Sequence, residues 1–137
     1  MRHKDVLVIV PVYNESHNLS KVISSLKIFF KNILVIDDGS EDNSLNILKE
    51  LDVNLIKHPI NLGQGAAIET GLNYLLNNKE YKYAVTFDGD GQNYPSDASK
   101  MTDFAKQNFL DAVVGSRFLR RDDNEEMPML RKIVLRL

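Results

Sequence analysis

The sequence predicts an α/β domain in which a mostly parallel sheet is flanked by helices. Apolar runs typical of strands alternate with amphipathic segments typical of helices along the chain. The first run, residues 6–10, is continuous and rich in β-branched side chains, as expected of a central strand that is covered on both faces. Polar residues directly follow three of the runs, which places a ligand site at the carboxyl ends of the strands.

The first half of the chain contains three expected strands and two expected helices. A helix is expected between Ser16 and Phe30, where apolar residues recur at helical spacing and where Ser16 or Asn18 can cap the start. Asp37 or Ser40 can cap the next helix. The expected strands are 6–10, 33–36 and 53–56, and the second helix is expected over about 42–51.

The second half continues the alternation after a loop that contains two glycines. Alanines and leucines favour a helix over residues 66–76, and an asparagine pair ends it. Pro95 can open a further helix that runs through Phe104 or Lys106. The expected strands in this half are 83–87 and 112–114, and the polar stretch 119–127 is expected to be a mobile loop.

Length and composition are those of one globular domain, which we expect to span residues 1–137. The net charge of -2, from 17 Lys and Arg against 19 Asp and Glu, argues against a surface built to bind nucleic acid. The absence of cysteine excludes disulfides and thiolate metal sites. Because the composition gives no support for an extracellular disulfide scaffold, we expect a cytoplasmic protein. No apolar stretch approaches the length of a membrane span, so we expect the chain to be soluble.

The motif with the clearest chemistry is the acidic segment 88–92, which follows an expected strand. Asp88 and Asp90 are two residues apart, so both carboxylates point the same way in an extended segment, and Gly89 lets the backbone approach a ligand. Hard oxygen ligands of this kind suit Mg²⁺ or Mn²⁺ that bridges to a diphosphate, and Gln92 could add a neutral oxygen. The alternative is a tight turn, in which Asp and Gly are also favoured.

Two further segments have both a binding and a structural interpretation. Asp38 could accept hydrogen bonds from a ribose hydroxyl or a base N–H, whereas the segment 37–40 could instead form only a helix cap. The loop 61–65 lacks the third glycine of a dinucleotide fingerprint, because Ile68 occupies that position. It could present N–H groups to an anion or form a plain turn. The three histidines, His3, His17 and His58, have no spacing of a joint metal site, and we expect them at the surface.

Five motifs occur in the order seen in family 2 glycosyltransferases, and the resemblance is greatest to the branch that includes dolichol-phosphate mannosyltransferase. The resemblance covers nearly the whole chain. The motifs are residues 10–15, 37–42, 61–66, 88–92 and 115–118.

The resemblance implies a GT-A fold and an inverting transfer of sugar from a UDP- or GDP-linked donor to an acceptor, expected to be a polyprenyl phosphate. It implies Mg²⁺ or Mn²⁺ as the cofactor and association with the cytoplasmic face of a membrane. By the resemblance, Asp90 and Arg117 are the expected catalytic residues. The expected metal ligands are Asp88, Asp90 and Gln92, and the expected nucleotide-sugar contacts are Pro11, Tyr13, Glu15, Asp38, Gly65, Asp88, Arg117 and Arg131.

Family members continue past the point that corresponds to Leu137, through a segment that completes the acceptor side. We therefore expect this chain to be C-terminally truncated relative to the family pattern. The competing hypothesis is a non-catalytic module that binds a nucleotide or a phosphate, including a receiver-like domain with an acidic pocket formed by Asp37, Asp38 and Asp88. A receiver-like domain needs its acidic pair after the first strand, whereas in this chain the pair follows the second.

Overall fold

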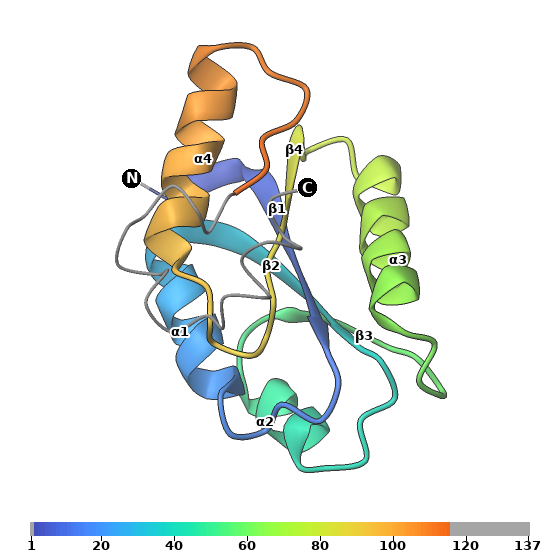
Figure 1. Ribbon diagram of the computed structural model, residues 1–137. Coiled ribbons are helices and arrows are strands. Elements are labelled where there is room, and N and C mark those ends of the chain that lie inside the picture. The colour runs from blue at the N-terminus through green and yellow to red at the C-terminus, as the bar shows by residue number, and fades with distance from the viewer. Residues whose placement is uncertain (1, 116–137) are drawn as a thin grey trace, which may run out of the picture.

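The computed structural model describes residues 2–115, which form a four-stranded parallel sheet with helices on both faces (Figure 1). Strands and helices alternate as the sequence predicts. In chain order the elements are β1 (His3–Val12), α1 (Leu19–Phe29), β2 (Phe30–Asp37), α2 (Ser44–Glu50), β3 (Asn54–Lys57), α3 (Gln64–Asn77), β4 (Tyr83–Thr86) and α4 (Pro95–Gln107).

The strand order in the sheet is β3-β2-β1-β4, and every pair is parallel. The central strand β1 is longer than the expected 6–10 because His3 pairs with Phe30 at one end and Val12 with Asp37 at the other. From β1 the sheet first grows on one side, through β2 and β3, and then on the other side of β1, where β4 is added. The direction of growth therefore reverses between β1 and β4, which is a topological switch point. A receiver-like domain would place β1 between β2 and β3, so this strand order excludes that alternative.

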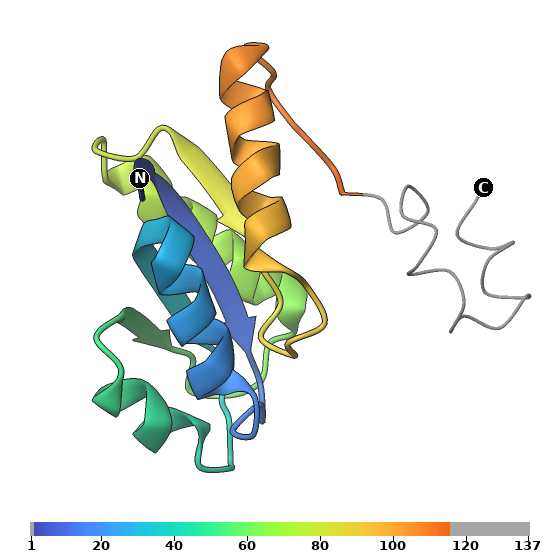
Figure 2. The same ribbon diagram turned by 90° about the vertical axis from the view of Figure 1, so that its left-hand side faces the viewer.

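The two faces of the sheet carry separate apolar clusters. Val8 and Val10 of β1 face the side covered by α1, α2 and α4, whereas Leu7 and Ile9 face α3. Figure 2 shows α1 and α4 in front of the sheet and α3 behind it. Residues 6–10 are fully buried, which agrees with the prediction of a strand covered on both sides.

The helix α3 lies close against β1 because it carries a glycine at the contact. A Cβ added to Gly71 would lie 2.4 Å from Cγ2 of Ile9, so only glycine allows this approach. The contact fixes the depth of α3 on the sheet and therefore the place of its first turn beside the carboxyl ends of the strands.

Two local expectations are wrong. Residues 112–114 form no strand: they pair with no other segment of the described chain, and Val114 is 89% exposed. So short an apolar run can make few ladder hydrogen bonds, and no burial compensates. The expected helix caps are also not formed. At the start of α1 the Asn18 side chain makes no cap hydrogen bond. At the start of α2 it is Asp42, and not Asp37 or Ser40, that accepts a hydrogen bond from the Ser44 N–H. The expected loop 119–127 lies outside the described residues.

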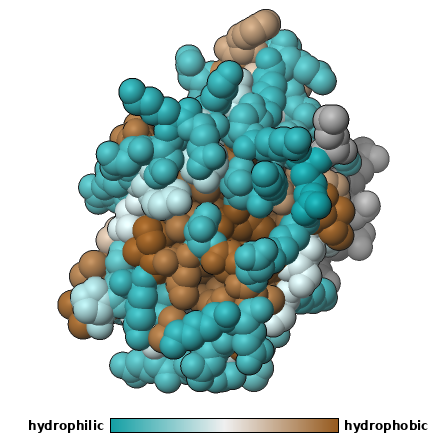
Figure 3. Space-filling model, turned by 180° about the vertical axis from the view of Figure 1, so that it is seen from behind, coloured by the Kyte–Doolittle hydropathy of each residue, from teal (hydrophilic) through white to brown (hydrophobic). Residues whose placement is uncertain are grey.

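The surface seen from behind has an apolar area framed by hydrophilic residues (Figure 3). Exposed apolar areas are typical of surfaces that another segment or partner covers. Across residues 2–115, no helix is both long and apolar enough to cross a membrane.

Candidate functional site

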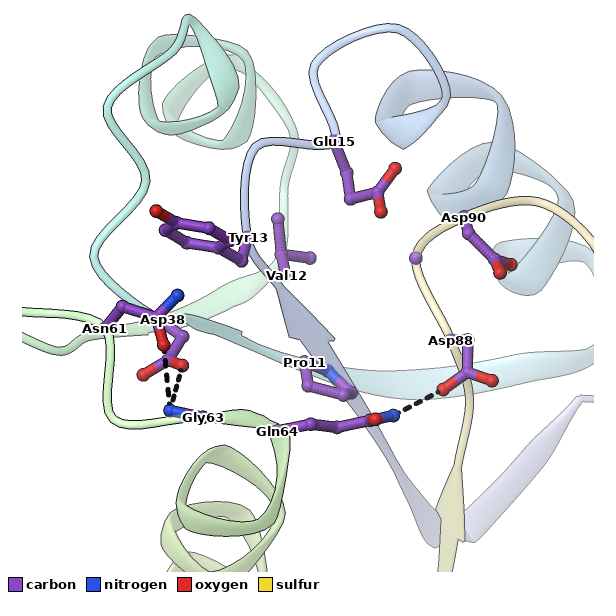
Figure 4. Close-up of a pocket in the computed structure, with 11 residues that line it drawn as sticks. Pro11, Val12, Tyr13, Glu15, Asp38, Asn61, Gly63, Gln64, Asp88 and Asp90 are labelled. Atoms are coloured by element: carbon purple, nitrogen blue, oxygen red, sulfur yellow. Dashed lines mark hydrogen bonds between the residues drawn. The ribbon is translucent and has the colours of Figure 1, made fainter.

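A pocket of about 380 Å³ opens at the carboxyl ends of β1, β2 and β4 (Figure 4). Its volume is within the range of sites that bind small molecules. It lies at the topological switch point between β1 and β4, where ligands of open α/β sheets bind. The lining residues are Pro11, Val12, Tyr13, Glu15, Asp38, Asn61, Gly63, Gln64, Asp88, Gly89 and Asp90.

The wall that follows β1 is held by hydrogen bonds to the loop that follows β2 and to the start of α2. The N–H groups of Asn14 and Glu15 donate to the hydroxyls of Ser40 and Ser44, at 3.0 and 3.1 Å. Asn14 has a left-handed backbone (φ 55°), which asparagine tolerates, and its side-chain oxygen accepts from the Glu41 N–H. These bonds fix the backbone that presents Tyr13 and Glu15 to the pocket.

Asp38 at the end of β2 is a buried carboxylate with only 3% of its side chain exposed. It accepts hydrogen bonds from the N–H groups of Leu62 and Gly63, at 3.0 and 2.7 Å, and contacts His58 at 2.7 Å. Burial alone raises the pKa of Asp38, but these three donors outweigh it and hold the pKa below its ordinary value. Asp38 is therefore ionised at neutral pH and ties the loop 61–63 to the sheet.

His58 is not a surface residue, contrary to the expectation from sequence. It is 7% exposed, and its two ring nitrogens contact Asp38 and Thr70. His17 is exposed, as expected, while His3 is partly buried and stacks on Phe30. No local pattern signalled the burial of His58, because both of its partners lie far from it along the chain.

The far wall of the pocket is the acidic segment after β4. Asp88 accepts hydrogen bonds from the side-chain amides of Gln64 at 2.9 Å and Asn93 at 3.2 Å, one on each carboxylate oxygen. Figure 4 shows Gln64 reaching to Asp88 from the start of α3. Within the described part of the chain, Asp90 accepts a hydrogen bond only from the Gln92 N–H, at 2.9 Å, through one of its two oxygens. Both carboxylates thus keep unused acceptor capacity.

The donor set at this wall fits a hard divalent cation. No group of three or more acidic or histidine side chains in residues 2–115 forms a complete metal site. Mg²⁺ and Mn²⁺ do not need one, because they commonly take one or two protein carboxylates and fill the remaining positions with water and phosphate oxygens. Asp88 and Asp90 supply such a pair beside a pocket of a size that admits a diphosphate.

The structure brings six of the predicted site residues to one pocket: Pro11, Tyr13, Glu15, Asp38, Asp88 and Asp90. Gly65 and Gln92 do not line it. Gly65 lies in the first turn of α3, and the described contact of Gln92 is the bond from its backbone N–H to Asp90. Arg117 and Arg131 lie outside the described residues.

Five lining residues are absent from the site residues expected from the sequence: Val12, Asn61, Gly63, Gln64 and Gly89. Three of them belong to the glycine-containing loop 61–65, whose position before a helix was the available signal. Gly89 lies against β1, where an added Cβ would be 3.3 Å from Cγ2 of Val12. Its location between the two aspartates gave a reason to expect a close backbone approach.

Comparison with known proteins gives consistent similarities. The family model of Glycosyl transferase family 2 matches residues 7–136. The UDP-N-acetylglucosamine--dolichyl-phosphate N-acetylglucosaminyltransferase of Methanococcus voltae is 34% identical, over 97% of this chain and 60% of that protein. The polyprenol monophosphomannose synthase of Mycolicibacterium smegmatis is 31% identical, over 94% of this chain and 51% of that protein. The chain thus spans about half to three fifths of these relatives.

A solved structure has the same fold at low sequence identity. It is glucosyl-3-phosphoglycerate synthase from Mycobacterium tuberculosis in complex with Mn²⁺, uridine diphosphate and glucosyl-3-phosphoglycerate. The TM-score is 0.57 at 18% identity, and the match covers 80% of this chain and 40% of that one. The sheet and helices of residues 2–115 therefore have the GT-A fold, as predicted.

Proposed function

The chain belongs to glycosyl transferase family 2, and from this premise we propose that it carries the donor site of an inverting glycosyltransferase that acts on a UDP- or GDP-linked sugar. The proposed acceptor is a polyprenyl phosphate, because one relative above 30% identity is named as a transferase for dolichyl phosphate and another as a polyprenol monophosphomannose synthase. On this account residues 1–137 are a catalytic domain that works at the cytoplasmic face of a membrane.

One observation carries the proposal: side chains from three strand ends converge on the pocket at the switch point. The loop after β1 supplies Tyr13 and Glu15, the end of β2 supplies Asp38, and the loop after β4 supplies Asp88 and Asp90. An aromatic ring and acceptor groups on one wall suit a nucleoside, and paired carboxylates on the other suit a diphosphate with its cation.

We assign the donor to the pocket in that orientation. Pro11, Tyr13, Glu15 and Asp38 would hold the nucleoside, and Gly65, at the exposed start of α3, would lie beside the phosphates. Asp88 and Asp90 would hold Mg²⁺ or Mn²⁺, with Gln92 as a further candidate ligand. Arg117 and Arg131 are proposed to face phosphate groups on the grounds of the sequence alone.

In this proposal the residues orient the donor and stabilise the negative charge of its leaving group. The bound cation would offset the negative charge that develops on the departing nucleoside diphosphate. Asp88 and Asp90 would hold this cation at the end of β4, and Arg117 would add a fixed positive charge. A phosphate acceptor is already ionised at neutral pH, so its oxygen can displace the diphosphate from the opposite face of the sugar without a general base, and the anomeric carbon inverts.

A second candidate function is nucleotide-sugar binding without transfer. It is favoured by one observation: the pocket is lined by an aromatic ring and carboxylates, Tyr13, Asp38, Asp88 and Asp90 among them, which suit a nucleotide and its cation. Binding of a nucleotide-sugar requires no further group. The pocket would then bind the donor, but no sugar would be transferred.

A transfer assay separates the two functions. The protein is incubated with labelled UDP- and GDP-sugars, dolichyl or undecaprenyl phosphate in detergent, and Mn²⁺ or Mg²⁺. Label in the lipid fraction, with an inverted anomeric configuration by NMR, is the expected result. Donor binding without lipid label would establish the second function, and the absence of both would refute the donor assignment.

A further inference from the structure

We propose that His58, supported by Thr70, is a positioning residue that fixes the Asp38 carboxylate and, through it, the pocket loop 61–63. The proposal deepens the function proposed above and rests on it for the identity of the ligand. His58 itself does not line the pocket; it acts through a residue and a loop that do.

The three side chains form a buried chain of contacts from α3 to the pocket. Nε2 of His58 lies 2.9 Å from Oγ1 of Thr70, and Nδ1 lies 2.7 Å from Oδ1 of Asp38. Only 9% of the His58 side chain and 3% of the Asp38 side chain are exposed. Water therefore cannot easily replace either partner, and the geometry of the carboxylate depends on the imidazole.

The direction of the His58 to Asp38 bond follows from the chemistry of the two groups. An ionised carboxylate only accepts, so Nδ1 of His58 carries a proton and donates it. Thr70 has one hydroxyl hydrogen, and it lies within reach of both the Ala66 carbonyl, at 3.0 Å, and His58 Nε2. Whichever of the two accepts this hydrogen, Nδ1 of His58 remains the donor to Asp38.

The loop 61–63 is attached to the sheet through the same carboxylate. Oδ1 accepts from His58 and from the Leu62 N–H, and Oδ2 accepts from the Gly63 N–H. His58 also joins β2 through its own backbone, because its N–H donates to the Asp37 carbonyl at 2.8 Å. A shift of Asp38 would therefore move Leu62 and Gly63 together, and with them the pocket wall formed by Asn61 and Gly63.

This arrangement gives His58 an effect on ligand affinity that is separable from its effect on stability. Among the described hydrogen bonds, the loop 61–63 is joined to a side chain of the sheet edge only through Asp38, since the bond from the Gly63 N–H to Asn61 lies within the loop. A residue that only filled space would change the melting temperature when replaced. A positioning residue also changes the affinity of the pocket, and a replacement that restores the Nδ1 donor recovers it.

The test compares His58→Ala, His58→Asn and Thr70→Val in the whole protein. The asparagine side-chain amide can place a donor near the position of Nδ1, while it loses the contact to Thr70. Thr102→Val is the matched control for Thr70→Val, because Thr102 makes the same bond to the carbonyl four residues earlier, to Ala98 at 2.8 Å, in α4. His3→Ala is the control for His58→Ala, since His3 is partly buried at the other end of β1 and bonds Ser99.

Two readouts are taken for each variant: the dissociation constant for UDP and GDP with Mn²⁺, and amide hydrogen exchange at Leu62 and Gly63. His58→Ala is expected to weaken binding at least about tenfold and to accelerate both amides by a similar factor, since a charge-assisted hydrogen bond is lost. His58→Asn is expected to recover most of the nucleotide affinity and most of the protection of the Leu62 and Gly63 amides. Thr70→Val is expected to produce a smaller loss of the same kind, while Thr102→Val and His3→Ala leave affinity and these two amides unchanged.

The amide exchange measurement tests the positioning role of His58 independently of the proposed function. If the unchanged protein binds neither UDP nor GDP, the donor assignment fails, and the positioning role is decided by the Leu62 and Gly63 amides alone. If His58→Ala leaves those amides as protected as in the unchanged protein, or lowers only the melting temperature, the positioning role is overturned. Equal losses in His58→Ala and His58→Asn would also overturn it, because the Nδ1 donor would then not matter.

Discussion

Replacing Gly71 by alanine tests whether the α3 to β1 contact determines how the site is assembled. The added Cβ would lie 2.4 Å from Cγ2 of Ile9 and 3.0 Å from its Cγ1 and Cδ1. Ile9 is fully buried in the central strand, and a β-branched side chain has little freedom about χ1. The side chain of Ile9 therefore cannot turn away, and α3 must lift from the sheet.

The expected loss of stability is the difference between two opposed effects. Overpacking of a well-packed core costs typically about 1 to 3 kcal/mol, and a contact as short as this one belongs at the upper end. Alanine is favoured over glycine in a helix by about 1 kcal/mol. We expect Gly71→Ala to lower the free energy of unfolding by about 2 kcal/mol.

Gly65→Ala is the matched control, because Gly65 lies in the same helix and an added Cβ there would meet nothing within 4 Å. Chemical denaturation followed by circular dichroism measures both variants. Gly65→Ala is expected to be neutral or to stabilise the protein by up to about 1 kcal/mol. If Gly71→Ala is as stable as Gly65→Ala, α3 does not pack on β1 at this depth, and its first turn does not bring Gln64 beside Asp88.

Asp90→Ala is expected to abolish the Mn²⁺-dependent rise in melting temperature with UDP or GDP and to leave the apo protein nearly as stable, because Asp90 is a partly exposed residue beyond β4. Val85→Ala removes packing from β4, and it is expected to lower the free energy of unfolding by about 1 kcal/mol and to keep the rise in melting temperature with ligand. If Asp90→Ala instead keeps this rise, or loses stability as Val85→Ala does, Asp90 is a structural turn residue. Burial alone raises the pKa of Asp42, but hydrogen bonds from Ser44 and Ser16 lower it to about 2. The stabilisation from the ionised Asp42 carboxylate is thus present above about pH 4 and lost as the pH falls toward 2. Over this interval the melting temperature of Asp42→Asn should approach that of the unchanged protein. A difference in melting temperature that stays constant would contradict the lowered pKa of Asp42.

The elements of the fold could be predicted because each carries its own local pattern. The β-branched run at the start of the chain predicted β1, and the helical spacing after Ser16 predicted α1. What local pattern could not predict is pairing. Residues 112–114 have the composition of a strand, but strand formation depends on a neighbour and on burial, which they lack in the described chain.

The site could be predicted in part for a topological reason. Residues that directly follow parallel strands share one edge of the sheet, so Tyr13, Asp38 and Asp88 were expected near one another, and all three line the pocket. Contacts that depend on tertiary geometry were not accessible. His58 meets Asp38 across 20 residues, and Gln64 meets Asp88 across 24, and neither pair has a sequence spacing that signals it.

The most direct test of the central claim is calorimetric titration of the protein with UDP and with GDP, each in the presence and absence of Mn²⁺. The pocket at the switch point is expected to bind at least one of the two nucleotides, more tightly with Mn²⁺, and Asp90→Ala is expected to remove the dependence on the cation. Heat of binding that is absent for both nucleotides, with and without Mn²⁺, would contradict the assignment of this pocket to a nucleotide-sugar donor.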